Sequence, residues 1–444
     1  MMEIATNTTF QKYPAYKDSG EYWMGDIPEY WEIKKLKHVF REKKKITNPS
    51  LNCGSISFGK VVYKDDEKIP ESTKASYQEV LAGEYLVNPL NLNYDLISLR
   101  IGLSDINVVV SSGYIVLKSA IELDKSYFNY LLNRYDVAYM KLLGSGVRQT
   151  ISFNHIANSL LAYPPKEEQI AIATFLDDKT AKIDRAIAQK EQLIALLKER
   201  KQIIIQNAVT KGLPAEERVK AGLDSNVKMK DSGVEWIGEI PEHWEVIPIR
   251  RLVDVRDGTH DTPEYIDEFK ESFHLITSKD FKGDEIDFSN AKSISKKDFL
   301  EISKRSAVQS GDVIMSMIGG NIGKSVIAND FTDYAIKNVG LFKTQGNIQL
   351  SKFIRYYLQS GLLDIQIEIN SRGGAQGFLS LGDLRNLKFF KIPSTELIEI
   401  IKNIETQSTK IHQAISLQQT QIEKLKEYKA TLIDSAVTGE IKVT

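Results

Sequence analysis

The stretch "IDRAIAQKEQLIALLKERKQIIIQNAVT", residues 183–210, has the spacing of a long amphipathic helix. Its apolar residues recur in steps of three, four and seven, which is the heptad-like pattern of a helix that packs on another helix. The residues of this stripe are Ile183, Ile187, Ile194, Leu197 and Ile204. No proline or glycine occurs from Glu167 to Val209, and the run stops at residues 212–214, "GLP". We therefore predict one helix from Glu167 to Val209.

A second stretch repeats this pattern 228 residues later: "IHQAISLQQTQIEKLKEYKATLIDSAVT", residues 411–438. It predicts a helix from about Thr395 to Val437. The residues of its stripe are Ile411, Ile415, Ile422, Leu425 and Leu432. A helix of about 40 residues is roughly 60 Å long and cannot bury such a stripe alone. The two helices either dock on separate globular domains or pack on each other as a coiled coil, and their shared register favours the coiled coil.

A tryptophan motif is also present twice. Residues 18–33 read "DSGEYWMGDIPEYWEI", residues 231–246 read "DSGVEWIGEIPEHWEV", and ten of the sixteen positions are identical. All four tryptophans of the chain lie in these two copies. The motif is either a binding surface or a structural anchor. We favour the anchor, because glycine and proline set a turn there and tryptophan brings a large apolar surface to a core.

The regions between these repeats predict mixed α/β structure. Short β-rich runs alternate with turns, and residues 125–143 and 350–367 have the pattern of counterpart amphipathic helices. The predicted organisation is two globular α/β domains that alternate with two long helices, as a pseudo-twofold internal repeat. Its segments are a first domain at 1–162, a long helix at 163–212, a linker at 213–230, a second domain at 231–391 and a C-terminal helix at 392–444.

Composition narrows the class of protein. The formal net charge is -1, so the chain as a whole is not basic, and a nucleic-acid contact would have to come from local clusters. Cys53 is the single cysteine, which excludes an internal disulfide and is typical of a reducing compartment. The N-terminus has no apolar core of the signal-peptide type, and no run of about eighteen apolar residues occurs. We expect a cytoplasmic protein that does not contact a membrane.

The sequence predicts neither a catalytic residue nor a metal site. No two of the six histidines have the spacing of metal ligands, and carboxylates are scattered. Residues 319–325, "GGNIGKS", resemble a phosphate-binding loop, but that motif needs glycine where Ile318 stands. We expect a glycine turn there that presents Asn321 and Lys324.

Four further segments are candidates for contact with DNA. The basic run at 34–45 is either a solvated face or a phosphate contact, and the turn at 257–263, "DGTHDTP", is either a plain loop or a base contact. Two loops, "GSGVRQT" at 144–150 and "RGGAQG" at 372–377, combine glycine with arginine and glutamine, the side chains suited to guanine and adenine in the major groove. Together with the turn at 319–325, these segments contribute the candidates Lys43, Lys44, Lys45, Ser145, Arg148, Gln149, Thr259, His260, Asn321, Lys324, Arg372 and Gln376.

The sequence resembles one known family. Two stretches are similar to the conserved regions of specificity subunits of Type I restriction–modification systems. They are "MKDSGVEWIGEIPEHWEV" (229–246) and "PPKEEQIAIATFLDDKTAKIDRAIAQKEQLIALLKERKQIIIQNAVTKGL" (164–213). The second helical copy departs from this wording, since "IPSTEL" stands at 392–397 where the first copy has "PPKEEQ".

This resemblance implies a function. Each variable region would be a target recognition domain that reads one half of a bipartite, gapped site in double-stranded DNA. The long helices would form an antiparallel coiled coil that sets the spacing. Two modification subunits, which carry S-adenosylmethionine and the adenine methyltransferase, would dock on the conserved regions, and restriction subunits that use ATP and Mg would join them. This chain would itself hold no cofactor and perform no chemistry.

Two other readings stay open. The chain could be an enzyme, such as an unrecognised nuclease, which metal-dependent cleavage by the isolated chain would reveal. It could also be a coiled-coil scaffold with two peptide-binding domains, which would not bind DNA in a salt-sensitive way.

Overall fold

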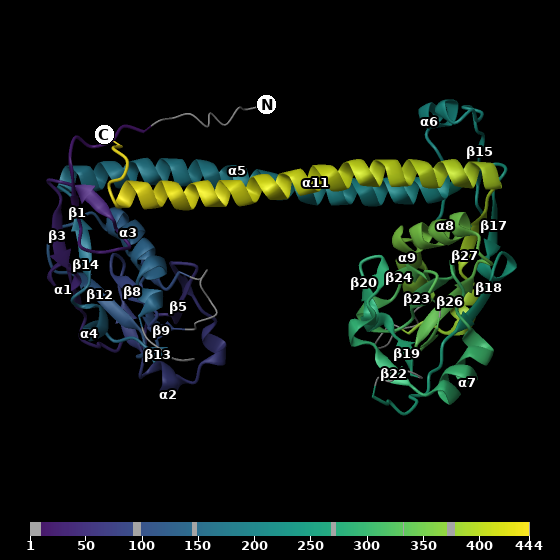
Figure 1. The fold of residues 1–444 in the computed structure, drawn as a ribbon, viewed down its shortest axis with the longest axis horizontal. Helices are drawn as coiled ribbons and strands as arrows, with labels where there is room; N and C mark the ends of the chain where they lie inside the picture. Colours follow the sequence, from purple (N-terminus) through teal and green to yellow (C-terminus); the bar gives the residue numbers. More distant parts are fainter. Residues whose placement is uncertain are drawn as a thin grey trace. The chain divides into compact units, whose positions relative to one another are not determined.

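The computed structural model describes residues 10–91, 99–143, 149–267, 272–331, 333–370 and 378–443. The chain divides into two compact units, the first formed by residues 1–190 and 420–444 and the second by residues 191–419. Each unit therefore contains one mixed α/β domain and part of each long helix (Figure 1). None of the helices within the described ranges has both the length and the apolar character needed to cross a membrane.

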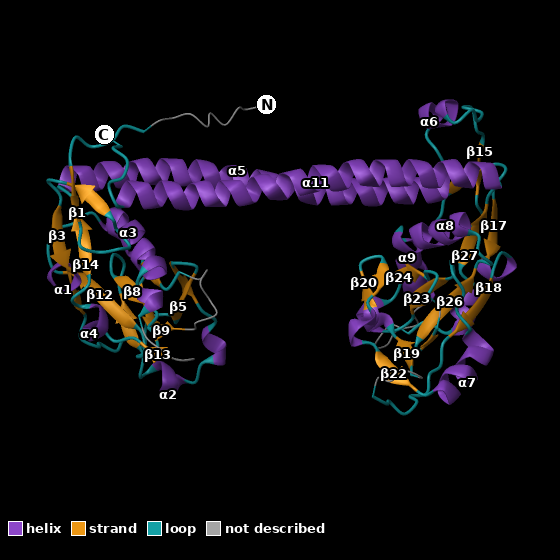
Figure 2. Ribbon diagram, in the orientation of Figure 1, coloured by secondary structure: helices purple, strands orange, loops and turns teal. Residues whose placement is uncertain are grey.

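The two long helices are present where the heptad pattern predicted them. Helix α5 spans Lys166–Lys211 and helix α11 spans Ser394–Val437. Proline precedes each helix, at Pro165 and Pro393, as is usual before the first turn. In Figure 2 they are the two longest helices of the chain.

Short strands make up most of the first unit. They are β1 (Tyr16–Asp18), β2 (Asp26–Pro28), β3 (Glu32–Lys35), β4 (Phe40–Glu42), β5 (Gly54–Ser57), β6 (Lys60–Tyr63), β7 (Gln78–Val80), β8 (Tyr85–Val87), β9 (Leu90–Asn91), β10 (Ile101–Leu103), β11 (Val108–Val110), β12 (Ile115–Ser119), β13 (Gln149–Thr150) and β14 (Leu160–Tyr163). Its shorter helices are α1 (Leu36–Val39), α2 (Glu71–Lys74), α3 (Lys125–Ala138) and α4 (Phe153–Ile156), with 3-10 turns η1 (Asp66–Lys68) and η2 (Met140–Leu142).

The second unit has a similar content. Its strands are β15 (Met229–Asp231), β16 (Glu239–Pro241), β17 (Glu245–Pro248), β18 (Asp254–Asp257), β19 (Phe273–Ile276), β20 (Phe281–Lys282), β21 (Glu285–Ile286), β22 (Lys292–Ile294), β23 (Val313–Ser316), β24 (Ser325–Ile327), β25 (Tyr334–Ile336), β26 (Val339–Lys343) and β27 (Lys388–Lys391). Its shorter helices are α6 (Ala215–Lys220), α7 (Lys296–Ser306), α8 (Ile348–Gln359), α9 (Leu362–Asn370) and α10 (Leu381–Arg385), with 3-10 turns η3 (Ile249–Arg251), η4 (Ser278–Asp280), η5 (Phe288–Asn290) and η6 (Gly319–Asn321).

Three strand arrangements recur in both units. Each tryptophan motif begins with a two-stranded antiparallel pair, β1–β2 in the first unit and β15–β16 in the second. The strand after it pairs with the strand before the long helix, as β3–β14 and as β17–β27. Each unit also has a four-stranded sheet, ordered β10-β8-β12-β4 and β24-β23-β26-β18. Numbered along the chain, the strands of both sheets have the order 3-2-4-1.

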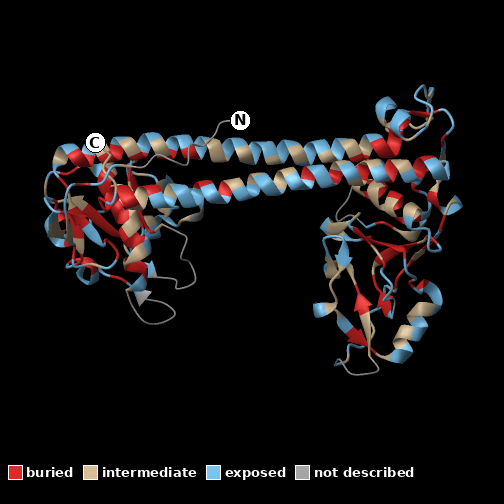
Figure 3. Ribbon diagram, turned by 45° about the horizontal axis from the view of Figure 1, so that its top comes forward, coloured by how far each residue is buried: buried red, intermediate tan, exposed pale blue. Residues whose placement is uncertain are grey.

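Each unit has its own hydrophobic core, to which both long helices contribute (Figure 3). In the first unit the stripe residues Ile183, Leu425 and Leu432 are buried with the aromatic side chains of α3. Of the ten predicted stripe residues, Ile183, Ile411, Ile422, Leu425 and Leu432 are buried, and Ile187, Ile194, Leu197, Ile204 and Ile415 are half-buried. In the second unit Ile205, rather than its neighbour Ile204, enters the core, because this end of α5 packs on a globular domain as well as on α11.

Three segments differ from their predicted structure. The single helix predicted at 350–367 is two helices, α8 and α9, because Gly361 between them has a φ of +85°. The counterpart at 125–143 ends as a helix at Ala138 and continues as the turn η2. The predicted linker at 213–230 includes helix α6 and strand β15, and it buries Arg218.

Candidate nucleic-acid interface

The turn after β18 in the second unit holds one pair of predicted DNA contacts, Thr259 and His260. Gly258 lets this turn approach strand β25 closely, since a Cβ there would lie 2.3 Å from the Ile336 carbonyl oxygen. The His260 side chain is 44% exposed, and both of its ring nitrogens are engaged: Nε2 lies 3.0 Å from Asp257 Oδ2 and Nδ1 lies 3.1 Å from Asn338 Oδ1. The imidazole is therefore held in one orientation while nearly half of the side chain stays exposed.

Two aromatic side chains lie together beside this turn. The ring centroids of His260 and Phe378 are 6.4 Å apart, and Phe378 is exposed. Phe378 directly follows residues 371–377, which contain the predicted contacts Arg372 and Gln376 and lie outside the described residues. The turn and Phe378, the first described residue after this loop, are thus brought together. Exposed aromatic rings on a fixed turn can contact thymine methyl groups or stack on bases.

The buried carboxylate of Asp257 holds this turn in place from the protein interior. Asp257 is buried, and it forms an ion pair with Arg305 of helix α7 in addition to its contact with His260. Arg305 remains more than half exposed. The arrangement places one guanidinium and one imidazole around a buried carboxylate at the surface of the second unit.

The basic run of the first unit requires a correction. Lys43, a predicted phosphate contact, is buried, and its ammonium group lies 2.9 Å from Glu84 Oε2 and 3.0 Å from Glu79 Oε1. Its hydrogen bond lowers the pKa of Glu79. Lys43 is therefore a core ion-pair partner and is not available to a phosphate. The neighbouring Lys44 and Lys45 are exposed, as a phosphate contact requires.

The glycine-rich loop of the first unit is only partly described. Ser145 and Arg148 lie outside the described residues. The backbone of Gln149 begins strand β13, which pairs with β9, while the Gln149 side chain lies outside the described part. Beside this strand pair Arg100 Nε donates to Asp136 Oδ1 at 2.9 Å, in a buried ion pair.

The "GGNIGKS" segment is a hairpin connection. Strands β23 and β24, which flank it, pair antiparallel, whereas a phosphate-binding loop joins a strand to a helix. The prediction of a turn is therefore confirmed. Asn321 ends the turn η6 and is half-buried, and Lys324 is exposed in a groove that α5 and α11 also line.

Each tryptophan motif is anchored on a glutamate in the first turn of a long helix, a feature that the sequence analysis missed. In the first unit, buried Glu168 of α5 accepts hydrogen bonds from Tyr13 Oη at 2.5 Å, Tyr30 Oη at 3.0 Å and Trp31 Nε1 at 3.0 Å. Burial and the hydrogen bond to Glu168 raise the pKa of Tyr30 to about 12. All three donors are neutral groups.

In the second unit the corresponding acceptor is Glu396 of α11. It accepts hydrogen bonds from Trp244 Nε1 at 3.2 Å and from the buried guanidinium of Arg218, and His243 Nε2 lies 2.6 Å from its Oε2. Burial by itself raises the pKa of Glu396, but the hydrogen bonds from His243, Arg218 and Trp244 outweigh it, so the pKa is lowered. A signal for this pair was present in the sequence, because Glu168 and Glu396 are separated by the same 228 residues as the two helical stretches.

A glycine that follows the end of a long helix packs against the tryptophan of each anchor, after α11 in the first unit and after α5 in the second. In the first unit Gly439, after α11, has a φ of +77°, and a Cβ there would lie 2.3 Å from Pro28 Cδ and 3.0 Å from Trp31 Cη2. In the second unit Gly212, after α5, has a φ of +75°, and its Cβ would lie 3.3 Å from Trp244 Cζ2. Each tryptophan therefore packs where one long helix begins and the other ends. The motif acts as a structural anchor, as the sequence analysis favoured.

Within the described ranges, no cluster of three or more histidine, cysteine, aspartate or glutamate side chains is placed to hold a metal ion. Cys53 is buried.

Comparison with known proteins gives consistent results. Residues 241–428 match a family model described as the Type I restriction modification DNA specificity domain. The chain is 27% identical over 286 residues to the EcoBI specificity subunit of Escherichia coli, an alignment that covers 64% of this chain and 58% of that subunit. It is 23% identical over 432 residues to the MjaVIII specificity subunit of Methanocaldococcus jannaschii, with 94% of each chain covered.

Two solved structures have a similar fold. One, from a study of complex assembly and conformational transition of the type I R-M system, has a TM-score of 0.63 at 14% identity and covers 93% of this chain and 98% of its own. The other is the HsdS subunit from Thermoanaerobacter tengcongensis, with a TM-score of 0.50 at 14% identity and coverage of 94% and 98%.

Proposed function

We propose that this chain, which belongs to the family of Type I restriction–modification specificity subunits, reads two separated half-sites in double-stranded DNA, one with each unit. The observation that carries the proposal is the recurrence of one architecture in both units: the same sheet order, the same strand pairs and the same tryptophan–glutamate anchor. Two related readers on one chain suit a bipartite site, because matched half-sites require matched binding modules.

The outer loops of each unit are the proposed readers. In the second unit, support comes from the exposed rings of His260 and Phe378, since Phe378 directly follows in sequence the loop that contains Arg372 and Gln376. Because the four-stranded sheets have the same strand order in the two units and the loop sequences differ, each unit would read a different half-site. Lys44 and Lys45 would contribute phosphate contacts in the first unit.

The two long helices are the proposed ruler between the half-sites. They would pair as one antiparallel coiled coil about a pseudo-twofold axis. Side-chain contacts within the units support this pairing: Lys429 Nζ lies 2.7 Å from Asp184 Oδ1, and Lys190 Nζ lies 2.5 Å from Gln421 Oε1, both in the first unit. In the second unit Lys201 Nζ lies 2.9 Å from His412 Nε2. As the residue number rises along α5, the number of its partner in α11 falls, as in antiparallel pairs.

Partner subunits would supply the chemistry. Leu193, Leu196 and Ile203 of α5 are exposed apolar side chains and offer a contact surface for a modification subunit. We propose two modification subunits, one for each unit, that bring S-adenosylmethionine and methylate adenine, and restriction subunits that use ATP and Mg. This chain would direct them to DNA without a catalytic residue or cofactor of its own.

One experiment tests the proposed function directly. The chain is expressed together with its modification subunit in a host without other DNA methylation, and methylated adenines are mapped across the genome. A single gapped motif, methylated on both strands, is the expected result. A stable copurified complex that methylates no motif would contradict the proposal and would favour the scaffold reading.

A further inference from the structure

A groove in the second unit lies between the long helices and the globular domain. Its volume is about 920 Å³. The residues that matter here are Lys198 and Lys201 of α5, Ser408 and His412 of α11, Arg355 of α8 and Lys324 of the β23–β24 turn. All of them belong to the second unit, and Lys324 is also one of the candidates for DNA contact.

Three of the four lysine and arginine side chains that line this groove lack an ion-pair partner within the described structure. Lys198, Lys201 and Lys324 form no ion pair with the described part of the chain. Lys201 Nζ instead lies 2.9 Å from His412 Nε2. Burial, together with the nearby charge of Arg355, lowers the pKa of Lys201. Cations that face one another in this way are stabilised when an anion binds between them.

Three carboxylates also line the groove, Asp284, Asp364 and Glu405, and none of them forms an ion pair with its lysines within the described residues. Glu405 is paired with Lys352 of α8, at 2.7 Å. Asp284 is paired with Arg355. This second pair engages one terminal nitrogen of the Arg355 guanidinium and leaves its Nε without a hydrogen-bond partner in the described structure. The lysines of the groove therefore remain without a carboxylate partner.

Two buried polar atoms of the groove also lack partners. Ser408, which is 9% exposed, has no hydrogen-bond partner for Oγ within the described structure, and neither does Nε of Arg355. Buried donors are nearly always satisfied in folded proteins, so each exception needs an explanation. A ligand that accepts hydrogen bonds would satisfy both atoms.

We propose that this groove binds a phosphate group, which Arg355, Lys201 and Ser408 hold while Lys198 and Lys324 add positive potential. A phosphate offers acceptor oxygens in several directions and more than one negative charge, so it can accept from donors on three elements at once. A carboxylate offers only two oxygens on one edge. The phosphate would come from a free phosphate or nucleotide, or from the DNA backbone. Binding of a free phosphate or nucleotide goes beyond the proposed function and does not depend on it, whereas binding of the DNA backbone rests on that function.

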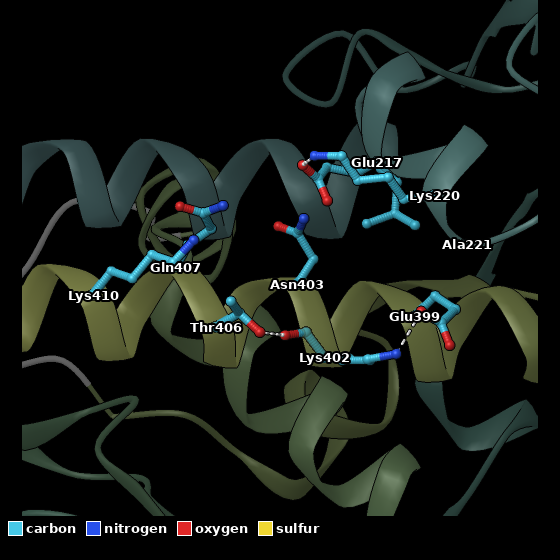
Figure 4. Close-up of a pocket in the computed structure, with 10 residues that line it drawn as sticks. Glu217, Lys220, Ala221, Glu399, Lys402, Asn403, Thr406, Gln407 and Lys410 are labelled. Carbon is cyan, nitrogen blue, oxygen red and sulfur yellow. Dashed lines mark hydrogen bonds and ion pairs between the residues drawn. The ribbon is translucent and has the colours of Figure 1, made fainter.

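A second pocket on another face of α11 provides the matched control (Figure 4). Two of its three lysines are neutralised locally: Lys220 Nζ lies 2.7 Å from Glu217 Oε1, and Lys402 Nζ lies 3.6 Å from Glu399 Oε2. Lys410, at the rim of this pocket, is exposed on the same helix as Ser408. Replacing Lys410 therefore removes one positive charge from α11 without altering the groove.

The test is a calorimetric titration of the full-length chain with inorganic phosphate at low ionic strength, and separately with a duplex DNA that lacks the target site. We expect Lys201→Gln to weaken phosphate binding about tenfold, the loss of one hydrogen bond to a charged group. Ser408→Ala should weaken it less, and Lys410→Gln should leave it within about twofold of wild type. Thermal melts establish that each variant is folded.

The results of these titrations distinguish a free phosphate or nucleotide from the DNA backbone as the source of the bound phosphate. Weakened binding of inorganic phosphate in Lys201→Gln and Ser408→Ala supports a free phosphate or nucleotide. If only the duplex binds, and Lys201→Gln reduces its salt dependence while Lys410→Gln does not, the DNA backbone is the source. Equal binding of both probes by wild type and Lys201→Gln overturns the proposal. The proposal is also overturned if Lys201→Gln and Ser408→Ala weaken only the binding of a modification subunit, since an acidic protein surface would then be the occupant.

Discussion

The indole Nε1 of Trp31 donates a hydrogen bond to Oε2 of Glu168 at 3.0 Å, although the two residues are 137 positions apart. The bond joins the tryptophan motif to the first turn of α5. The same bond recurs in the second unit between Trp244 and Glu396, at 3.2 Å. The repeated motif and the repeated helix are therefore joined by the same hydrogen bond in each unit. This bond fixes the direction in which each long helix leaves its globular domain.

Replacing Trp31 with phenylalanine should destabilise the first unit more than replacing Trp23. Both side chains are buried, and both substitutions remove similar volume, but the Nε1 of Trp23 has no hydrogen-bond partner within the described structure. Trp31→Phe also loses a hydrogen bond to a carboxylate, so the difference in the free energy of unfolding should be about 1.5–3 kcal/mol. Urea unfolding followed by circular dichroism measures it. Equal losses would show that the Trp31–Glu168 bond adds no stability.

Replacing Glu396 with glutamine should give a pH-dependent loss of stability. The variant leaves buried Arg218 without its counter-charge, which costs about 3–5 kcal/mol near neutral pH. The pKa of Glu396 is lowered in the folded protein, so this carboxylate stabilises the fold above its unfolded pKa of about 4.5. That contribution is lost as the pH falls from about 4.5 through the lower folded pKa.

The measurement is the urea midpoint of wild type and Glu396→Gln across this pH range. We expect the gap between the two midpoints to narrow as the pH falls. Glu168→Gln is the control, because the donors of Glu168 are neutral and no buried cation is stranded. A gap that stays constant down to acid pH would refute the role of the Glu396 charge.

Replacing Gly439 with alanine should destabilise the first unit more than replacing Gly20. Both glycines have a positive φ, +77° and +73°, so both substitutions carry a backbone cost of about 1–3 kcal/mol. Nothing lies within 4 Å of a Cβ at Gly20, whereas a Cβ at Gly439 would lie 2.3 Å from Pro28 Cδ. Thermal unfolding should show a larger drop in Tm for Gly439→Ala. Equal drops would mean that Pro28 moves away freely.

Local patterns in the sequence predicted the long helices well. The heptad stripe and the flanking glycine and proline residues are local signals, and α5 and α11 begin and end within a few residues of the predicted limits. The recurrence of similar segments also indicated two related domains. A glycine inside an apolar pattern was misread, since Gly361 separates α8 from α9.

Contacts between distant strands could not be predicted in this way. Lys43 stands in a basic run that looks solvated, but Glu79 of β7 and Glu84, just before β8, bury and neutralise it. Glu168 looks like an ordinary charged residue at the start of a helix, and only the tryptophan motif that folds over it makes it an acceptor. Candidates of the kind that sequence suggests, such as arginine and glutamine in glycine-rich loops, still need a functional test.

Substitutions in one glycine-rich loop should change one half of the recognised motif only. Replacing Arg372 and Gln376 with alanine removes the proposed base contacts of the second unit, and replacing Arg148 and Gln149 removes those of the first. Each lost bidentate contact should cost about 1–3 kcal/mol of discrimination at its own base pair. Maps of methylated adenines report the motif for each variant. If either pair alters both halves equally, the assignment of readers is wrong.

A heptad inserted into both long helices should lengthen the gap and leave both half-sites unchanged. Suitable points are after Lys190 in α5 and after Gln419 in α11, where the chain passes from one unit to the other. Seven residues add about 10 Å of helix and keep the apolar stripe on the same face, which corresponds to roughly three base pairs at 3.4 Å each. The methylated motif of the variant gives the new gap. An insertion in α5 alone is the control, because it breaks the register with α11 and should lower solubility and abolish methylation. An unchanged gap with both insertions would rule out the helices as the ruler.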